Sequence, residues 1–369
     1  MKVKFTNFPK EFKSLKKELT HKFISIGKEG QYVLGKELEI FEEKIQKYLK
    51  VKHVLGVGNW TEGTIMVLKA LGYQQKDEVI TVSNSFIATC GAIAYSGQIP
   101  KLVDVGDDLN IDVNLVEKRI TKKTRAIMPV HLSGIPSNLD SLKKICKKYK
   151  LHLIEDAAHA FGTKYKNKYI GTIGDVGLFS LHPRKSFHIL GDGGLIVTNN
   201  TELYKKILLM RNHGLKNRDE SIIWGTNSRL DNLQAGFGNI MLNKISLWNK
   251  KQLNIALKYS KLLKGFLKTP VFDLKISNPT FHQYIVRTKY RNELKEFLNN
   301  NNIDTAIHYP IPIHKQIAYK NQFGEISLPM TDKFCKEILS LPINPYLTES
   351  EVNYVIKKIK EFFLNIKNK

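Results

Sequence analysis

Four residues in the middle of the chain have side chains that could do covalent and acid–base chemistry. Asp156 and His159 follow one short apolar run, and Ser180 and Lys185 lie at or just beyond the end of the next. Apolar runs of this length are typical of buried strands. In open α/β sheets, ligands bind at the carboxyl ends of the strands. We therefore expect these side chains to meet at one edge of a sheet.

Lys185 and Asp156 form a pair with a specific chemical use. A lysine whose pKa is lowered can attack a carbonyl carbon and form a Schiff base. A carboxylate at a strand end can keep a ring nitrogen protonated. Enzymes that use pyridoxal phosphate need both groups around one ring. A surface lysine and a helix-capping aspartate explain either residue alone, so the prediction depends on the whole stretch 151–198.

An anion site is predicted nearer the N-terminus. Residues 54–57 are typical of a short strand, Gly-Asn-Trp-Thr-Glu-Gly at 58–63 of a turn, and the helix that follows runs to Leu71. Free backbone amides at the N-terminus of such a helix attract anions. The phosphate group of the cofactor should therefore lie here.

The elements that must hold these residues alternate between strands and helices. Further strands are expected at 78–82, 101–105, 125–130, 151–154, 176–179 and 195–197, with helices at 114–120 and 139–149. This alternation is typical of a mostly parallel sheet with helices on both faces.

A second, smaller domain should follow the sheet. A long amphipathic pattern over 242–267 predicts a helix that leads into it, and strands are expected at 281–288 and 305–308. We predict an α/β fold with a large domain over residues 1–245 and a smaller C-terminal α+β domain over 246–369.

The composition excludes several other classes of protein. The formal net charge of +24 is spread over lysine-rich helices without an arginine-rich arm, so we expect no nucleic-acid partner. The apolar runs are too short to span a membrane, and the first residues lack the apolar region of a signal peptide. Three widely spaced cysteines offer neither a disulfide framework nor a metal site, which favours a cytoplasmic protein without a bound metal.

Three motifs in the central stretch resemble those of a known family. They are Ile-Glu-Asp-Ala-Ala-His at 154–159, Phe-Ser-Leu-His-Pro-Arg-Lys at 179–185 and Gly-Asp-Gly-Gly at 191–194. In sequence and spacing the chain resembles the DegT/DnrJ/StrS family of sugar aminotransferases, over nearly its whole length. The resemblance implies the fold type I architecture of aspartate aminotransferase.

The resemblance also assigns roles around pyridoxal 5'-phosphate. Lys185 would bind the cofactor covalently and carry protons, while Asp156 would pair with the ring nitrogen. The other implied cofactor contacts are the stacking ring of Phe86, the bond from His159 to the ring oxygen, the hydroxyls of Ser180 and Thr61, and the backbone amides of Thr61 and Glu62. The family usually has a small residue before this threonine, where the chain has Asn59 and Trp60.

Other family positions point to a partner subunit and to the substrate. Asn227 and Arg229 match a Gly-x-Asn-x-Arg segment that reaches the cofactor phosphate of the neighbouring subunit, which implies a homodimer with shared active sites. The implied substrate contacts are Tyr32, His308, Tyr309 and His314, with His188 as lining of the pocket at most. Packing or helix capping explains several of these residues nearly as well.

The family resemblance implies transfer of an amino group from L-glutamate to a keto sugar, expected to be nucleotide-linked, in amino-sugar biosynthesis for a surface polysaccharide or glycoconjugate. The alternatives within the same chemistry are a phosphorylated or free keto sugar, or a keto sugar acid. A dehydratase with the same cofactor is the next alternative, although the dehydrating subgroup has histidine where this chain has Lys185. A binding protein that keeps the fold would be expected to have lost Asp156, Ser180 or Lys185.

Overall fold

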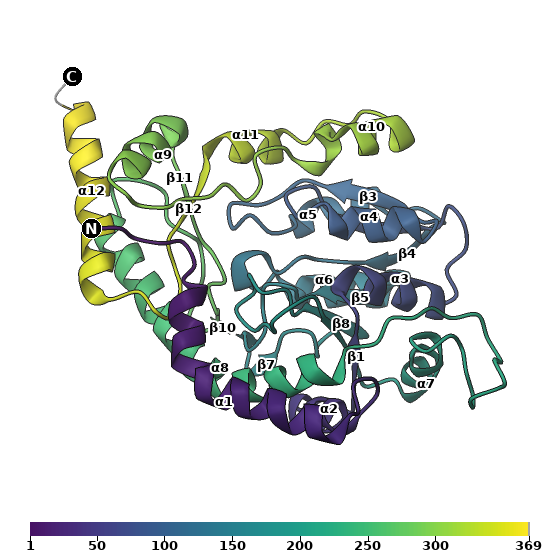
Figure 1. Cartoon of the computed structure of the whole chain (residues 1–369). Coiled ribbons are helices and arrows are strands. Elements are labelled where there is room, and N and C mark those ends of the chain that lie inside the picture. Colours follow the sequence, from purple (N-terminus) through teal and green to yellow (C-terminus); the bar gives the residue numbers. More distant parts are fainter. Residues whose placement is uncertain (368–369) are drawn as a thin grey trace.

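A seven-stranded sheet forms the centre of the computed structural model, which describes residues 1–367 (Figure 1). Its strands are β1 (His53–Val57), β2 (Glu78–Val82), β3 (Ile99–Val103), β4 (Thr124–Ile127), β5 (His152–Asp156), β8 (Val176–Ser180) and β9 (Gly194–Thr198). They lie in the order β1-β9-β8-β5-β4-β2-β3. Four neighbouring pairs are parallel, and β9 alone runs antiparallel to both of its neighbours, β8 and β1. The predicted mostly parallel sheet is confirmed.

Helices cover both faces of this sheet, as predicted. Along each strand, alternate residues belong to different buried clusters: Val54 and Leu55 point to opposite faces, as do Val79 and Ile80. One face packs against α1 (Phe8–Glu29), α2 (Lys36–Leu49), α5 (Val113–Val116), α6 (Leu139–Tyr149) and the first half of α8 (Asn232–Leu263). The other face packs against α3 (Trp60–Ala70), α4 (Ala88–Tyr95) and α7 (Thr201–Met210).

A C-terminal unit packs around the second half of α8. It contains the antiparallel pair β11 (Tyr284–Arg287) and β12 (Ile338–Leu341), flanked by α9 (Arg291–Asn300) and α12 (Glu349–Lys367). Val3, near the N-terminus, packs into the same cluster and pairs with Ile303. The smaller elements are β6 (Lys164–Tyr165), β7 (Lys168–Tyr169), β10 (Ser277–Asn278), α10 (Ile317–Phe323) and α11 (Pro329–Glu337).

The structure corrects two predicted elements in this region. No strand forms over 305–308, where a single bridge joins Ala306 to Ser340. Helix α8 begins at Asn232, well before the predicted start at 242, because its first turns are buried in the core of the sheet. The predicted domain division at 245/246 falls inside this continuous helix and stays a prediction. The helix changes from one buried cluster to the other between Trp248 and Ala256.

Candidate active site

Two strand ends bring the central polar residues together. Asp156 is the last residue of β5 and Ser180 the last of β8. The two strands pair in parallel, with Asp156 beside Leu178. Their carboxyl ends therefore share one edge of the sheet, which is where the sequence predicted a ligand.

The Asp156 carboxylate is buried and held by two hydrogen bonds. Thr89 Oγ1 donates to Oδ2 at 2.9 Å, and the Ala158 amide donates to Oδ1 at 3.2 Å. Burial raises the pKa of Asp156, while both hydrogen bonds and the charge of Lys185 act in the opposite direction. A cationic ring nitrogen placed beside this carboxylate would stabilise its ionised form further.

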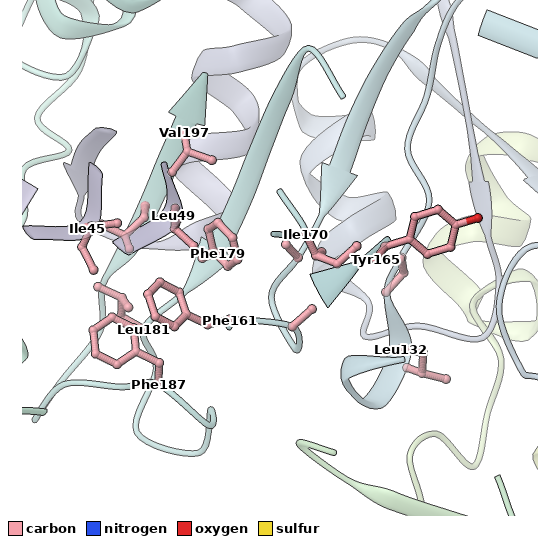
Figure 2. Close-up of a cluster of buried hydrophobic side chains, with 14 of the residues drawn as sticks. Ile45, Leu49, Leu132, Phe161, Tyr165, Ile170, Phe179, Leu181, Phe187 and Val197 are labelled. Atoms are coloured by element: carbon pink, nitrogen blue, oxygen red, sulfur yellow. The ribbon is translucent and has the colours of Figure 1, made fainter. Parts of the chain in front are cut away.

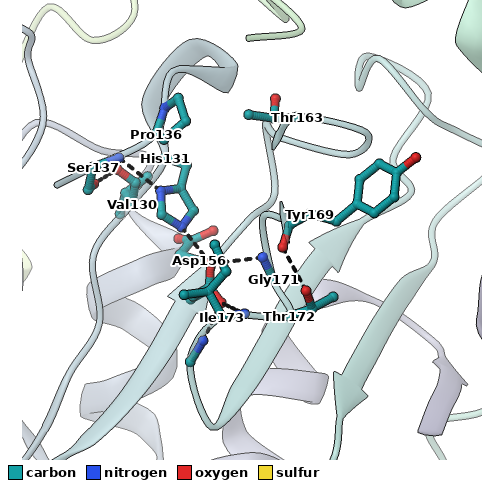
Figure 3. A network of polar contacts seen from close by, with 12 residues as sticks. Val130, His131, Pro136, Ser137, Asp156, Thr163, Tyr169, Gly171, Thr172 and Ile173 are labelled. Atoms are coloured by element: carbon teal, nitrogen blue, oxygen red, sulfur yellow. Dashed lines mark hydrogen bonds and ion pairs between the residues drawn. The ribbon is translucent and has the colours of Figure 1, made fainter. Parts of the chain in front are cut away.

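A buried network behind Asp156 fixes the end of β5 (Figure 3). The fully buried Glu155 carboxylate accepts backbone amides at 2.6 to 2.8 Å, from Gly171, Ile173 and Gly174. His131 Nδ1 accepts the Ser137 amide, so the ring proton lies on Nε2, which faces Glu155 at 3.2 Å. The His131 amide bonds the carbonyl of Asp156. The main chain that carries Asp156 is therefore rigidly placed.

Lys185 lies in a short closed loop after β8. The loop is closed by a bond from the Ile189 amide to the Leu181 carbonyl, at 3.0 Å. Phe187 anchors it in the core, stacked on Phe161 with ring centroids 4.2 Å apart (Figure 2). Burial lowers the pKa of Lys185 to about 8, and the charge of Asp156 opposes this shift only in part. A larger share of the amine is therefore neutral and nucleophilic at physiological pH than in an ordinary lysine.

Three histidines lie within reach of the charge of Lys185, and two of them, His282 and His308, line the same cavity as Lys185. Burial lowers the pKa of His159, His282 and His308, and the charge of Lys185 lowers each of them further. The rings of His159 and His282 lie 4.5 Å apart. His159 Nδ1 accepts the Ser133 amide at 3.3 Å, so the neutral ring carries its proton on Nε2. His159 can therefore donate to a ring oxygen, as the family resemblance implied.

The N-terminus of α3 lies against the start of β9, next to Ser180. Ser180 pairs with Gly194, and a Cβ atom on Gly194 would come within 2.8 Å of the main chain of Asn59. Only a glycine allows this close approach. The Ser180 hydroxyl accepts the His182 amide at 3.3 Å, which leaves its own proton for a ligand. Thr61 lies in the first turn of α3, close to the strand end that carries Ser180.

The roles of Glu62 and Trp60 in this turn differ from what the sequence led us to expect. The Glu62 amide, expected to bind phosphate, donates instead to Asn59 Oδ1 at 2.8 Å, because Asn59 caps the helix. The bulky Trp60 does not occupy the anion site. Its ring is buried among apolar side chains, and its indole N–H donates to the Leu178 carbonyl.

The candidate substrate residues are divided between the cleft and the core. The Tyr309 ring lies 5.8 Å from that of Phe86, which is 55% exposed beside the sheet edge, and His308 lies near Lys185. His314 is buried instead, with Nδ1 2.7 Å from Ser83 Oγ and Nε2 3.0 Å from Asp332. The structure therefore does not place His314 in the cleft, because its Nδ1 faces Ser83 just after β2 and its Nε2 faces Asp332 of α11.

Tyr32, expected to contact the substrate, and the two residues expected to reach a partner subunit, Asn227 and Arg229, lie on the surface or near it. Tyr32 is 56% exposed, Asn227 is exposed, and Arg229 Nη1 donates to Asn212 Oδ1 at 2.8 Å. The segment between α7 and α8 that carries Asn227 projects from the body of the molecule (Figure 1).

Sequence reasoning missed Thr89 and His282. Thr89 follows Phe86 closely, and a hydroxyl facing the predicted strand ends could have been proposed from that spacing. His282 offers no such signal, because it is a lone histidine before a predicted strand and approaches Lys185 only through the fold. His188, predicted as pocket lining, is buried and lines a cavity of about 250 Å³ beside Lys185.

The residues present fit pyridoxal phosphate. A buried carboxylate for the ring nitrogen, a lysine with a lowered pKa, a histidine donor and a hydroxyl beside a helix N-terminus lie around one sheet edge. The cofactor, when bound, supplies an electron-withdrawing ring that accepts the electron pair released when a proton leaves the neighbouring carbon. This combination of sheet and side chains defines a pyridoxal phosphate-dependent enzyme.

Comparison with known proteins narrows this class. Residues 13–360 match the DegT/DnrJ/EryC1/StrS aminotransferase family, and the chain belongs to this family. A relative from Streptomyces venezuelae, dTDP-3-amino-3,4,6-trideoxy-alpha-D-glucose transaminase, is 35% identical and aligns over 98% of this chain and 96% of its own. A relative from Aneurinibacillus thermoaerophilus, dTDP-3-amino-3,6-dideoxy-alpha-D-galactopyranose transaminase, is 37% identical over 94% and 95% of the two chains.

Solved structures give the same result. The crystal structure of DesV from S. venezuelae superposes with a TM-score of 0.95 at 36% identity, covering 98% of both chains. The Bacillus subtilis NtdA structure, solved with its bound pyridoxamine phosphate cofactor, gives 0.90 at 30% identity, covering 98% of this chain and 85% of that one. The protein is an aminotransferase that uses pyridoxal phosphate, as the sequence predicted. Among residues 1–367, no helix is long and apolar enough to cross a membrane.

Proposed function

We propose that the enzyme transfers the amino group of L-glutamate to the ketone of a nucleotide-linked keto sugar, in amino-sugar biosynthesis for a surface polysaccharide or glycoconjugate. The similarity to two dTDP-sugar transaminases over nearly the whole chain supports this acceptor. The observation that carries the proposed chemistry is the Lys185 amine, whose pKa burial lowers to about 8, within reach of the charge of the buried Asp156.

Each of the central residues has a definite task in this proposal. The neutral Lys185 amine would hold the cofactor and, once released from it, would carry a proton between the amine-bearing carbon of the substrate and the neighbouring carbon of the cofactor. Asp156 keeps the ring nitrogen protonated, while Thr89 holds its carboxylate in place. Ser180 and the first turn of α3, with Thr61, bind the phosphate, and the half-exposed Phe86 ring covers the face of the cofactor.

We further propose that the active enzyme is a cytoplasmic homodimer with shared sites. Within one chain, several aromatic and apolar side chains are left open to solvent: Trp224 is 95% exposed, Tyr32 56% and Ile222 50%. Large exposed apolar side chains of this kind are common at protein interfaces. Asn227 and Arg229 belong to the same projecting segment and would reach the cofactor phosphate of the partner subunit.

Isotope transfer tests the proposed reaction. Purified enzyme is incubated with ¹⁵N-labelled L-glutamate and a panel of dTDP- and UDP-linked keto sugars, with the corresponding free and phosphorylated sugars as controls. We expect ¹⁵N in the product of at least one nucleotide-linked sugar by mass spectrometry, and none with K185A. Amination of the free or phosphorylated sugars alone would contradict the nucleotide carrier. Loss of a hydroxyl without ¹⁵N would identify a dehydratase.

A further inference from the structure

A buried acid–base pair connects helix α1 to the loop that carries Lys185. His188 Nε2 lies 2.7 Å from Glu11 Oε1, and His188 Nδ1 lies 2.9 Å from the carbonyl oxygen of Lys185 itself. Both side chains are buried, with 4% of His188 and 8% of Glu11 exposed. Glu11 lies in the first turn of α1, far from Lys185 in the sequence. The contact therefore depends entirely on the fold.

The atoms that face the His188 ring determine where protons must lie. A backbone carbonyl only accepts, so Nδ1 must carry a proton to bond Lys185. Nε2 faces a carboxylate oxygen, so a further proton lies between it and Glu11. The imidazole therefore links Glu11 of α1 to the main chain of Lys185 through one hydrogen bond at each nitrogen.

The ring is also held on its faces. The indole of Trp248 lies nearly parallel to it, with centroids 6.1 Å apart, and Phe8 meets it edge-on at 6.2 Å. Phe8 belongs to α1 and Trp248 to α8, so two helices and the Lys185 loop meet at this imidazole. With a partner at each nitrogen and two aromatic rings against it, the imidazole is restricted in orientation, and this restricts the carbonyl of Lys185 that it bonds.

We propose that Glu11 and His188 are positioning residues that fix the main chain of Lys185, and with it the direction from which the amine reaches the cofactor. The inference rests on the proposed role of Lys185. Neither residue needs to touch the cofactor or the substrate. Since small displacements of a reacting group can cost large factors in rate, loss of the pair should slow the chemistry of Lys185.

Four substitutions and one matched control test the proposal. E11L and H188L remove the hydrogen-bonded pair, whereas E11Q keeps a hydrogen-bonding partner and H188N keeps a donor for the Lys185 carbonyl. E18A is the control, because it breaks a more exposed ion pair on the same helix, between Glu18 and Lys244. For each variant, the rate at which apo-protein captures pyridoxal phosphate is followed by absorbance, and kcat and KM are measured separately.

The expected pattern distinguishes positioning from other roles. E11L and H188L should lower the capture rate and kcat by about tenfold or more, with each KM changed less than about twofold. E11Q and H188N should recover most of both rates, and E18A should match the wild type. A raised KM with unchanged capture would make the pair a substrate contact, and a lowered Tm as the sole effect would make it structural. Either result overturns the proposal.

Two further measurements keep the outcomes separate. Circular dichroism identifies variants that fail to fold. If E11L or H188L fails to fold, the rates of E11Q and H188N test the proposal instead. Wild-type rates in both of these variants would then overturn it. K185A tests the proposed role of Lys185 by itself. If K185A still captured the cofactor covalently, the proposed function of Lys185 would be wrong, whatever the result for Glu11 and His188.

Discussion

Burial acts in opposite directions on the acid and the base at the cofactor site. It raises the pKa of Asp156 and lowers that of Lys185 to about 8. Both shifts favour the neutral form of the side chain. For Lys185 this is useful as it stands, because the neutral amine is the nucleophile. For Asp156, a cation beside the carboxylate would offset the effect of burial and keep the side chain ionised. The two residues together therefore suit a positively charged ring.

The lowered pKa of Lys185 predicts the pH dependence of cofactor capture by the apo-protein. The amine loses its proton as pH rises through about 8, so the capture rate should climb between about pH 6.5 and 9 and then level off. Stopped-flow absorbance with added pyridoxal phosphate measures this rate. An ordinary lysine would give a rate still climbing near pH 10, which would contradict the assigned environment.

Asp156→Asn should lower kcat without unfolding the protein. The substitution keeps the size of the side chain but removes the charge that faces the ring nitrogen, and kcat should fall by about 10²- to 10³-fold. Thr89→Val removes one donor to the same carboxylate and should cost about tenfold. Turnover with ¹⁵N-glutamate measures both. A Thr89→Val loss as large as that of Asp156→Asn would mean that the threonine acts in its own right.

At the scale of elements, the N-terminus of α3 should be sensitive to its cap. Asn59→Ala leaves the Glu62 amide without its side-chain acceptor and should cost about 1 kcal/mol of unfolding free energy. Because the freed amide lies in the first turn of α3, where we propose that the phosphate binds, the affinity for inorganic phosphate should not fall. Urea unfolding and phosphate titration measure the two effects.

Asn200→Ala is the matched control for this experiment. Asn200 caps α7 by accepting the amides of Glu202 and Leu203, so its loss should cost a similar amount of stability. It should leave phosphate binding unchanged. Weaker phosphate binding in Asn59→Ala alone would show that the asparagine side chain, rather than the amide, serves the anion.

The elements and the central site could be predicted because their signals are local. Apolar runs of strand length, with polar residues at their ends, indicate where β5 and β8 stop and therefore where Asp156 and Lys185 meet. Contacts between distant segments carry no such signal. His282 and Glu11 approach the Lys185 loop only after the chain has folded. His314 is the opposite case. Its position matched a family segment beside the substrate, but in the fold the side chain is buried and its Nδ1 faces Ser83.

At the scale of the whole molecule, the proposed shared site predicts complementation. K185A and R229A should each be inactive or weak alone. In a mixed dimer, one site would combine Lys185 from one subunit with Arg229 from the other, so a random equal mixture should regain about a quarter of wild-type activity. Denaturing and refolding the two variants together, then measuring turnover, tests this.

Two controls accompany the mixing experiment. The variants refolded separately and then combined on ice should stay near their individual activities, since subunits have not exchanged. K185A mixed with a second lysine variant, K185R, offers no intact site and should recover nothing. Failure of the K185A and R229A mixture, with dimers shown by light scattering, would place Arg229 at the site of its own chain.

Helix α8 has a practical consequence for anyone who wishes to divide this enzyme. The helix runs unbroken from Asn232 to Leu263 and contributes side chains to two separate apolar clusters. Fragments cut after residue 245 would each expose half of an interrupted helix and the apolar surface it normally fills. Such fragments should be insoluble when produced singly and recoverable when co-expressed, which would make the cut a usable split-protein reporter.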